Sequence, residues 1–363
     1  MKKDRSCGIK TSIGGQALVE GIMMRGPKRS AMAVRNLQGE MVIEEWDTKY
    51  SARNKFCKLP VIRGVFGFID SMSMGYKCLM RSAEISGLEE LEAEEKRAKE
   101  EKKLQKLAKK QGRDVEELRA ELEAKKAEET EKTESGAVDT SEAQKEKKES
   151  SVMMTVLGIV SGVFAVILMV GLFILLPTFI YEGLIEKIPG FPVDNRYLQS
   201  AFEGVLRVAL LIGYMALMTL LKDIRRTFQF HGAEHKTIFC YEAGLELTVE
   251  NVKKQKRFHP RCGTSFLMLM VLVSILVGFF IPPTIHKLLR IAIKILLIPV
   301  IMGIGYELIK LCGKYDNALT KAIAAPGKWF QRITVLEPDD GMIECAIAAI
   351  NKVIPEDGSD KIQ

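Results

Sequence analysis

Three of the four histidines in this 363-residue sequence fall within one stretch, as His231, His235 and His259. His231 and His235 are four residues apart, a spacing that puts two imidazoles on the same face of a helix. We expect residues 228–241 to be helical, because the segment contains no proline and is followed by Gly244. The spacing therefore predicts a pair of metal ligands.

A carboxylate and a thiol accompany these histidines. Glu234 completes the pattern H-x-x-E-H, the inverted zinc-protease pattern in which the glutamate is the general base. Two residues separate His259 from Cys262, in a turn that contains proline and glycine. Because a thiolate with imidazoles suits zinc better than magnesium or calcium, zinc is the predicted cofactor. The candidate catalytic residue is Glu234, and the candidate metal ligands are His231, His235, His259 and Cys262.

The number of ligands decides what such a site does. Four protein ligands would close a tetrahedral site, which is then structural. Three would leave a position for water, whose pKa a bound metal lowers toward about 7 beside Glu234. A third interpretation is that the histidines cap helices or contact lipid headgroups. Cys240 and Glu242 are lesser candidates, because both can simply belong to the end of the same helix.

Apolar segments place this cluster beside a membrane. Residues 152–176 contain no charge over the roughly 20 positions that a bilayer core requires, and residues 201–221, 266–281 and 288–304 are three further candidates. Lysine and arginine accumulate in the loop between the second and third segments and after the fourth, which marks the cytoplasmic side. We predict a multi-pass protein of the plasma membrane with both termini cytoplasmic.

Charged side chains also occur inside the predicted spans, among them Glu203, Arg207 and Lys294. Arg207 and Lys294 both fall toward the outer face in this orientation. We expect their long stems to snorkel to the interface, in preference to forming an ion pathway.

The predicted fold class is a polytopic α-helical membrane protein with about four spanning helices, a small N-terminal β-containing cytoplasmic domain and a charged helical insert. The N-terminal domain has predicted strands at Gln16–Met24, Ser30–Arg35 and Met41–Trp46. A helix over 59–84 is predicted to be interfacial, with a plain core helix as the alternative. The domains are 1–87 (N-terminal domain), 88–150 (charged insert, helical then disordered), 151–221 (first two spans), 222–265 (cytoplasmic loop with the candidate site), 266–306 (last two spans) and 307–363 (C-terminal segment with a terminal helix).

The distribution of charge limits the classes of binding partner, and the spacing of the cysteines bears on disulfide formation. The formal net charge is +7, but the basic residues are spread over the insert and the margins of the apolar segments. This distribution indicates membrane orientation and no nucleic-acid partner. The expected partners are membrane lipids and other membrane proteins. The seven cysteines have no paired spacing, so no disulfide framework is expected.

Four stretches of sequence resemble one known family. They are Gly14–Gly21 continuing through Met23–Pro27, His231–Thr237, His259–Phe266 and Glu337–Asp340. They resemble the YqhQ-like family of bacterial membrane proteins, which has no known function and is commonly labelled a predicted metal-dependent enzyme. The resemblance covers the chain except the insert at 88–150. It implies a bacterial inner membrane, a metal site on the histidines above, and no particular reaction.

The family's motifs add further positions to consider. Arg25 lies in a Gly/Pro turn, where a guanidinium could meet a phosphate or carboxylate, or could stabilise the turn. Asp339, Asp340 and Glu344 open a predicted C-terminal helix over 341–354, where acidic residues favour the N-terminal end for reasons unrelated to function.

Two functions follow from these observations. The first is a zinc hydrolase at the cytosolic membrane margin that acts on a lipid or a membrane-protein segment, with Glu234 as base. The alternative is a non-enzymatic scaffold or a partner in biogenesis or quality control, in which the metal is structural. A transporter is less favoured, because the charges in the spans are peripheral and no repeat with broken helices is evident.

Overall fold

The computed structural model describes residues 9–48, 59–87, 101, 105, 160–185, 188, 195–282, 285–315 and 317–362. The chain divides into two compact units, residues 1–86 with 171–363 and residues 87–170. The predicted insert at 88–150 lies outside the described residues, apart from Glu101 and Gln105, which are both helical.

The first unit begins with a four-stranded antiparallel sheet. Its strands follow one another in the order β1-β2-β3-β4, with bounds Gly14–Leu18, Gly21–Arg25, Arg29–Arg35 and Met41–Asp47. The predicted small antiparallel sheet is confirmed. The single strand predicted over Gln16–Met24 is wrong, because the chain reverses between Leu18 and Gly21, which pair with each other. The turn carries Glu20 at a φ of 48°, a conformation that glycine and asparagine favour, so no local signal marks it.

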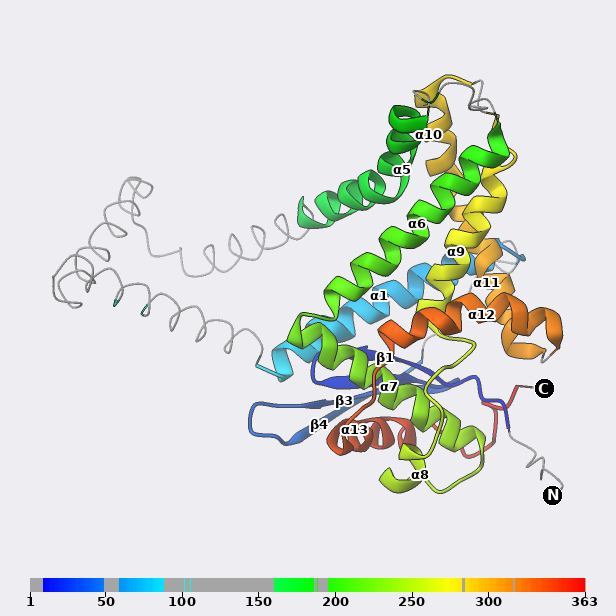
Figure 1. Ribbon diagram of the computed structural model, residues 1–363. Coiled ribbons are helices and arrows are strands. Elements are labelled where there is room, and N and C mark those ends of the chain that lie inside the picture. Colours follow the sequence, from blue (N-terminus) through cyan, green and yellow to red (C-terminus); the bar gives the residue numbers. More distant parts are fainter. Residues whose placement is uncertain are drawn as a thin grey trace, which may run out of the picture. The chain divides into compact units, whose positions relative to one another are not determined.

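Helices cover both faces of this sheet (Figure 1). On one face, Met23 and Met32 pack with Cys78 of α1 (Ile62–Ile85). On the other face, alternate residues such as Ile22 pack with α7 and with Ile343 of α13. The bounds of the latter two helices are Lys222–Glu242 and Asp340–Asn351. Because side chains alternate along a strand, the two central strands β2 and β3 are buried on both faces.

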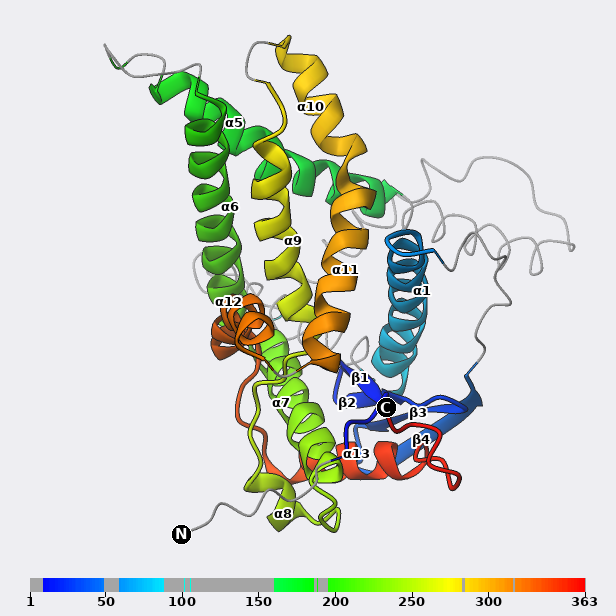
Figure 2. The same ribbon diagram turned by 90° about the vertical axis from the view of Figure 1, so that its right-hand side faces the viewer.

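The second part of this unit is a helical bundle. Helix α9 packs against α6, α11 and α12, and Figure 2 shows α6, α9 and α11 side by side. Their bounds are Arg196–Met218 for α6, Gly263–Gly278 for α9, Ile298–Lys314 for α11 and Ala318–Thr334 for α12. The remaining elements are η2 Gly171–Leu175, α5 Leu176–Ile180, η3 Tyr181–Ile185, α8 Val249–Lys253 and α10 Lys287–Leu296.

Three helices among the described residues are long and apolar enough to cross a membrane: Val160–Gly183, Tyr197–Met218 and Leu288–Lys314. They correspond to the first, second and fourth predicted spans. The third predicted span corresponds to α9, which is apolar but has only 16 residues. A bilayer core needs about 20 helical residues. The described part of the chain therefore has several apolar helices, of which three reach spanning length.

The two charges expected to snorkel are instead paired inside the bundle. Arg207 Nη2 lies 2.9 Å and Lys294 Nζ 2.6 Å from the carboxylate of Glu203, which is 2% exposed. Arg290 forms a similar pair with Glu182 at 2.6 Å. The expectation of snorkelling is wrong, because Glu203, one turn before Arg207 on α6, supplies a partner within the bundle. An unpaired charge buried inside the bundle would be costly.

Helix α1 has one packed side and one exposed apolar side. Gly64 lies against Tyr306 of α11, and Arg63 pairs with Glu307 at 2.5 Å. The exposed side of α1 carries large hydrophobic side chains, namely Phe66, Ile69, Met72, Tyr76, Leu79 and Met80. Exposed apolar residues on a packed helix favour the interfacial interpretation over a plain core helix.

Candidate metal centre

Two helices and a loop bring three potential ligands together. Residues 228–241 are helical as predicted, within α7, which places His231 and His235 on one face. Cys262 lies at the N-cap of α9. The ligand atoms of these three residues all lie within 4.8 Å of one another, and His231 Nε2 is 3.1 Å from Cys262 Sγ. The histidine pair and the cysteine predicted from sequence therefore form one cluster.

Main-chain carbonyls orient both imidazoles. His231 Nδ1 is 3.0 Å from the carbonyl oxygen of Thr334, and His235 Nδ1 is 2.5 Å from that of Arg257. Because a carbonyl only accepts hydrogen bonds, each Nδ1 carries a proton, and Nε2 is the nitrogen that would bind a metal after it has lost its own proton. Metal-binding histidines commonly donate their second ring N–H in this way. The two rings are therefore held in the orientation that metal ligation by Nε2 requires.

The cluster favours the thiolate form of Cys262. Burial acts to raise the pKa of this thiol, but the charges of His231 and His235 bring it well below its ordinary value. Burial likewise acts to lower the pKa of His231, and the neighbouring Cys262 thiolate overcomes this and raises it to about 9. The position of Cys262 at the N-terminus of α9 adds to the same effect. The thiolate is the form of cysteine that binds metals.

The chemistry of this donor set fits zinc. Two imidazole nitrogens and a thiolate sulfur match the borderline-soft character of Zn²⁺, whereas Mg²⁺ and Ca²⁺ prefer oxygen. Three protein ligands leave one tetrahedral position open, as in catalytic zinc sites. Of the two alternatives that the sequence leaves open, the arrangement of His231, His235 and Cys262 fits the open site.

The structure places His259 outside this group. Its Nδ1 accepts a hydrogen bond from the main-chain N–H of Arg261 at 3.2 Å, and its Nε2 lies 3.7 Å from the Glu242 carboxylate. Burial lowers the pKa of His259, so the ring is neutral near pH 7 with its proton on Nε2. Neither nitrogen then offers a lone pair to the cluster, although the rings of His259 and His235 are 5.7 Å apart.

Glu234 is buried next to the two histidines and faces the first strand. A Cβ on Gly15 of β1 would lie 2.7 Å from the carbonyl oxygen of Met23 and 3.0 Å from the carboxyl carbon of Glu234, so this close approach requires glycine. Burial raises the pKa of Glu234, while the charges of His231 and His235 and a hydrogen bond from the Gly15 backbone oppose the rise. The carboxylate is thus near the cluster without being one of its three donors.

Sequence reasoning missed Gln331, which holds the loop that carries Cys262. This side chain is fully buried, accepts from the His259 N–H at 2.8 Å, and donates to the His259 carbonyl at 2.7 Å and to Ser265 Oγ at 2.6 Å. A single glutamine on the amphipathic helix α12 carries no signal of this role. Its partners are brought to it only by the tertiary fold.

The segment that follows α12 is held against α7. The Leu336 N–H donates to the carbonyl of Phe228 at 2.9 Å, and a Cβ on Gly232 would lie 1.9 Å from Leu336 O. The buried Lys236 is paired with Glu337. These contacts hold the segment that begins at Thr334 in place. They therefore keep the Thr334 carbonyl oxygen next to His231.

The other sequence candidates have other partners. Cys240 is buried in the core between sheet and helices, with its sulfur 3.5 Å from the Glu246 carbonyl. Arg25 ends β2 opposite Ser30. Asp339 caps α13 by accepting from Met342 N at 2.8 Å, which confirms the helix-terminus interpretation. The two remaining acidic residues of that helix form ion pairs, Asp340 with Lys253 and Glu344 with Arg35.

The fold and the site together define a class of protein with several apolar helices, a helix-covered sheet and a buried histidine/cysteine cluster. The chain belongs to the family described as "Protein of unknown function (DUF1385)", whose model matches residues 59–356. It is 31% identical over 348 residues to the "Uncharacterized protein YqhQ" of Bacillus subtilis (strain 168), which covers 95% of this chain and 93% of that protein. No solved structure matches the chain. The YqhQ-like resemblance is confirmed.

Proposed function

We propose that this protein is a zinc-dependent hydrolase of the plasma membrane, with a multi-pass bundle and both termini in the cytoplasm. His231, His235 and Cys262 would hold the ion, and Glu234 would act as general base. The observation that carries the proposal is the convergence of these three donors, with both imidazoles oriented by main-chain carbonyls. Zinc bound there would polarise a carbonyl or phosphoryl oxygen of the substrate.

The residues of the chain supply the remaining requirements of such a reaction. Glu234 is buried on α7 within the electrostatic influence of His231 and His235, and in this proposal its carboxylate accepts a proton from the attacking group. The carbonyls of Thr334 and Arg257 keep the rings from rotating. Because Cys262 directly precedes the apolar helix α9, we infer that the site lies at the cytosolic membrane margin. A lipid or a membrane-protein segment is the natural substrate there.

The test compares the wild type with Glu234→Gln, each reconstituted in bilayers. Both proteins are incubated with a total lipid extract and with membrane proteins of the source bacterium, and hydrolysis products are sought by mass spectrometry. We expect products from the wild type only, with equal zinc in both proteins and none in His231→Ala/His235→Ala. Equal product from Glu234→Gln would refute the role of Glu234 as base.

A second candidate is a structural metal centre in a non-enzymatic scaffold. It is favoured by the fact that the ligands and their orienting carbonyls come from three separate stretches: α7, residues 257–262 and Thr334. A metal there would fasten these stretches together, and partners would be other membrane proteins. In that case Glu234→Gln changes nothing measurable, whereas His231→Ala lowers the unfolding temperature.

A further inference from the structure

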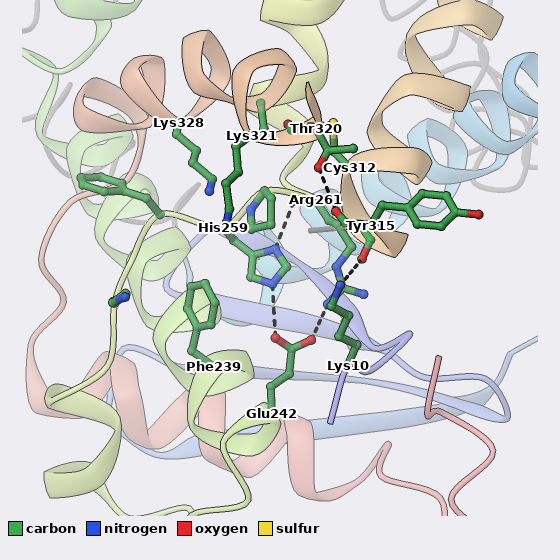
Figure 3. Close-up of a pocket in the computed structure, with 15 residues that line it drawn as sticks. Lys10, Phe239, Glu242, His259, Arg261, Cys312, Tyr315, Thr320, Lys321 and Lys328 are labelled. Carbon is green, nitrogen blue, oxygen red and sulfur yellow. Dashed lines mark hydrogen bonds and ion pairs between the residues drawn. The ribbon is translucent and has the colours of Figure 1, made fainter. Parts of the chain in front are cut away.

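A second site lies beside the cluster, on the far side of His259. It is a cavity of about 280 Å³ between the end of α7, the loop before α9, the end of α11 and one face of α12 (Figure 3). Cavities that hold drug-sized ligands start at roughly 300 Å³. This one therefore suits a small group, such as one headgroup, better than a whole lipid.

The lining of this cavity is strongly basic, and we call it the basic pocket. Five cationic side chains line it, against one carboxylate, Glu242. The five are Lys10, Lys256, Arg261, Lys321 and Lys328. Such an excess of positive charge in a concave, partly apolar site attracts anions.

Two of the cations are used by the fold. Arg261 is paired with Glu242 and also donates to the carbonyl of Thr11. Lys10 donates to the carbonyls of Gly313 and Lys314 at 3.2 and 3.1 Å, at the C-terminal end of α11. Both side chains nevertheless line the pocket.

Two other cations have no acidic partner within the described part of the chain. Among the residues that the structure describes, no carboxylate forms an ion pair with Lys256 or Lys328. Lys256 comes from the loop before α9 and Lys328 from α12, so the two amines approach the pocket from different elements, and Figure 3 shows Lys328 and Lys321 extending from α12 toward His259. Two lysines from separate elements can contact one anion from two sides.

The basic pocket adjoins both the metal centre and a candidate span. Arg261 of the pocket directly precedes Cys262, and the ring of His259 is 5.7 Å from that of His235. Cys312 and Gly313, which also line it, lie at the end of the candidate span Leu288–Lys314. A group bound in the pocket would therefore lie at the end of an apolar helix. It would also be in contact with His259, whose ring is next to that of His235 in the cluster.

We propose that the basic pocket binds the phosphate group of an anionic ligand and holds that ligand next to the metal centre. The phosphate can come from a lipid headgroup or from a soluble phosphate compound, and lysines and arginine recognise both. The role of the pocket as substrate site rests on the proposed function. The binding of phosphate does not, and it is tested separately.

The experiment measures binding of two probes to the purified full-length protein in detergent by isothermal titration calorimetry. The probes are inorganic phosphate and a short-chain phosphatidylglycerol. The test variant is Lys256→Gln/Lys328→Gln. The matched control is Arg332→Gln, which removes an exposed charge from α12 outside the pocket. Zinc content and unfolding temperature of each variant report whether the fold is kept.

We expect the wild type and Arg332→Gln to bind at least one probe equally well. The lysine variant should bind it about thirtyfold more weakly, on the basis of roughly a factor of five to six for each lysine near an anionic group. Binding of phosphatidylglycerol that phosphate displaces identifies a lipid headgroup, and binding of phosphate alone identifies a soluble ligand. No binding by the wild type, or equal binding by the lysine variant, overturns the proposal.

The two proposals fail in different ways in this experiment. A wild-type protein without zinc that still binds a probe through Lys256 and Lys328 refutes the metal centre and leaves the pocket standing. A zinc-loaded protein that binds neither probe refutes the pocket alone. Probe binding by His231→Ala/His235→Ala, which lacks the metal ligands, confirms that the pocket recognises phosphate by its own charges.

Discussion

Gly232 is the position where a single methyl group should disturb both the fold and the cluster. A Cβ there would lie 1.9 Å from the carbonyl oxygen of Leu336 and 3.1 Å from its carbon. The obstacle is main chain, which cannot turn aside as a flexible side chain can. The substitution Gly232→Ala must therefore push the segment around Leu336 away from α7.

The magnitude follows from three contributions. Overpacking of this kind costs about 1–3 kcal/mol. Separation of the Leu336 N–H from the Phe228 carbonyl, now 2.9 Å apart, costs about 1 kcal/mol more. The higher helix propensity of alanine over glycine stabilises the fold by about 1 kcal/mol and offsets part of this loss. The net destabilisation is about 1–3 kcal/mol, which for a chain of this length corresponds to an unfolding temperature lower by about 1–4 °C.

The same shift should weaken metal binding, because Thr334 is two residues before Leu336 and its carbonyl orients His231. Loss of such an outer contact lowers metal affinity by about 10- to 100-fold. The assay is thermal unfolding of the purified protein together with a zinc competition titration. Gly213→Ala is the control, since no atom lies within 4 Å of a Cβ built there. A Gly232→Ala protein as stable and as zinc-avid as Gly213→Ala would refute the reasoning.

Three further predictions concern other buried groups. Lys294→Met removes one of the two cations paired with Glu203, and its unfolding temperature should fall further than that of Lys294→Arg, which keeps the charge; equal values would contradict the role of the pair. Gln331→Met leaves the main chain of His259 without its buried partners, and should cost about 2–4 kcal/mol in thermal unfolding, whereas a neutral effect would contradict this. Burial acts to raise the pKa of Glu242, but His259 and Arg261 bring that pKa below its ordinary value of 4.5. The ionised Glu242 carboxylate therefore stabilises the fold above pH 4.5, and this stabilisation is lost as the pH falls through the lowered pKa. The free energy of unfolding should therefore fall less steeply below about pH 4.5 in Glu242→Gln than in wild type. An equally steep fall in the two proteins would exclude the effect.

The parts of the fold that could be predicted are those that depend on the spacing and type of residues close together in the sequence. The helical spacing of His231 and His235, the apolar segments and most of the sheet are of this kind. The turn at Glu20 could not be predicted, because its residue type does not favour the conformation that it adopts. The contacts that hold this hairpin in place come from β3, the strand that pairs with β2.

The candidate site was predictable in its residues and less so in its geometry. The spacing of His259 and Cys262 suggests that both bind the same metal, but the turn between them aims the two side chains differently. The Arg261 N–H occupies one nitrogen of His259, and Glu242 from α7 faces the other. No local pattern encodes these contacts, because they depend on the packing of the loop between α7 and α12. The pairing of Lys294 with Glu203 has the same non-local origin.

The measurement that tests the central claim most directly is the metal content of the purified protein, by elemental analysis, for wild type and four variants. The claim predicts about one zinc ion per wild-type chain, lost in His231→Ala, His235→Ala and Cys262→Ala. His259→Ala should keep its zinc, because both nitrogens of that ring face other partners. A wild-type protein free of metal after chelator-free purification, or loss of zinc in His259→Ala equal to that in Cys262→Ala, would contradict the three-ligand centre.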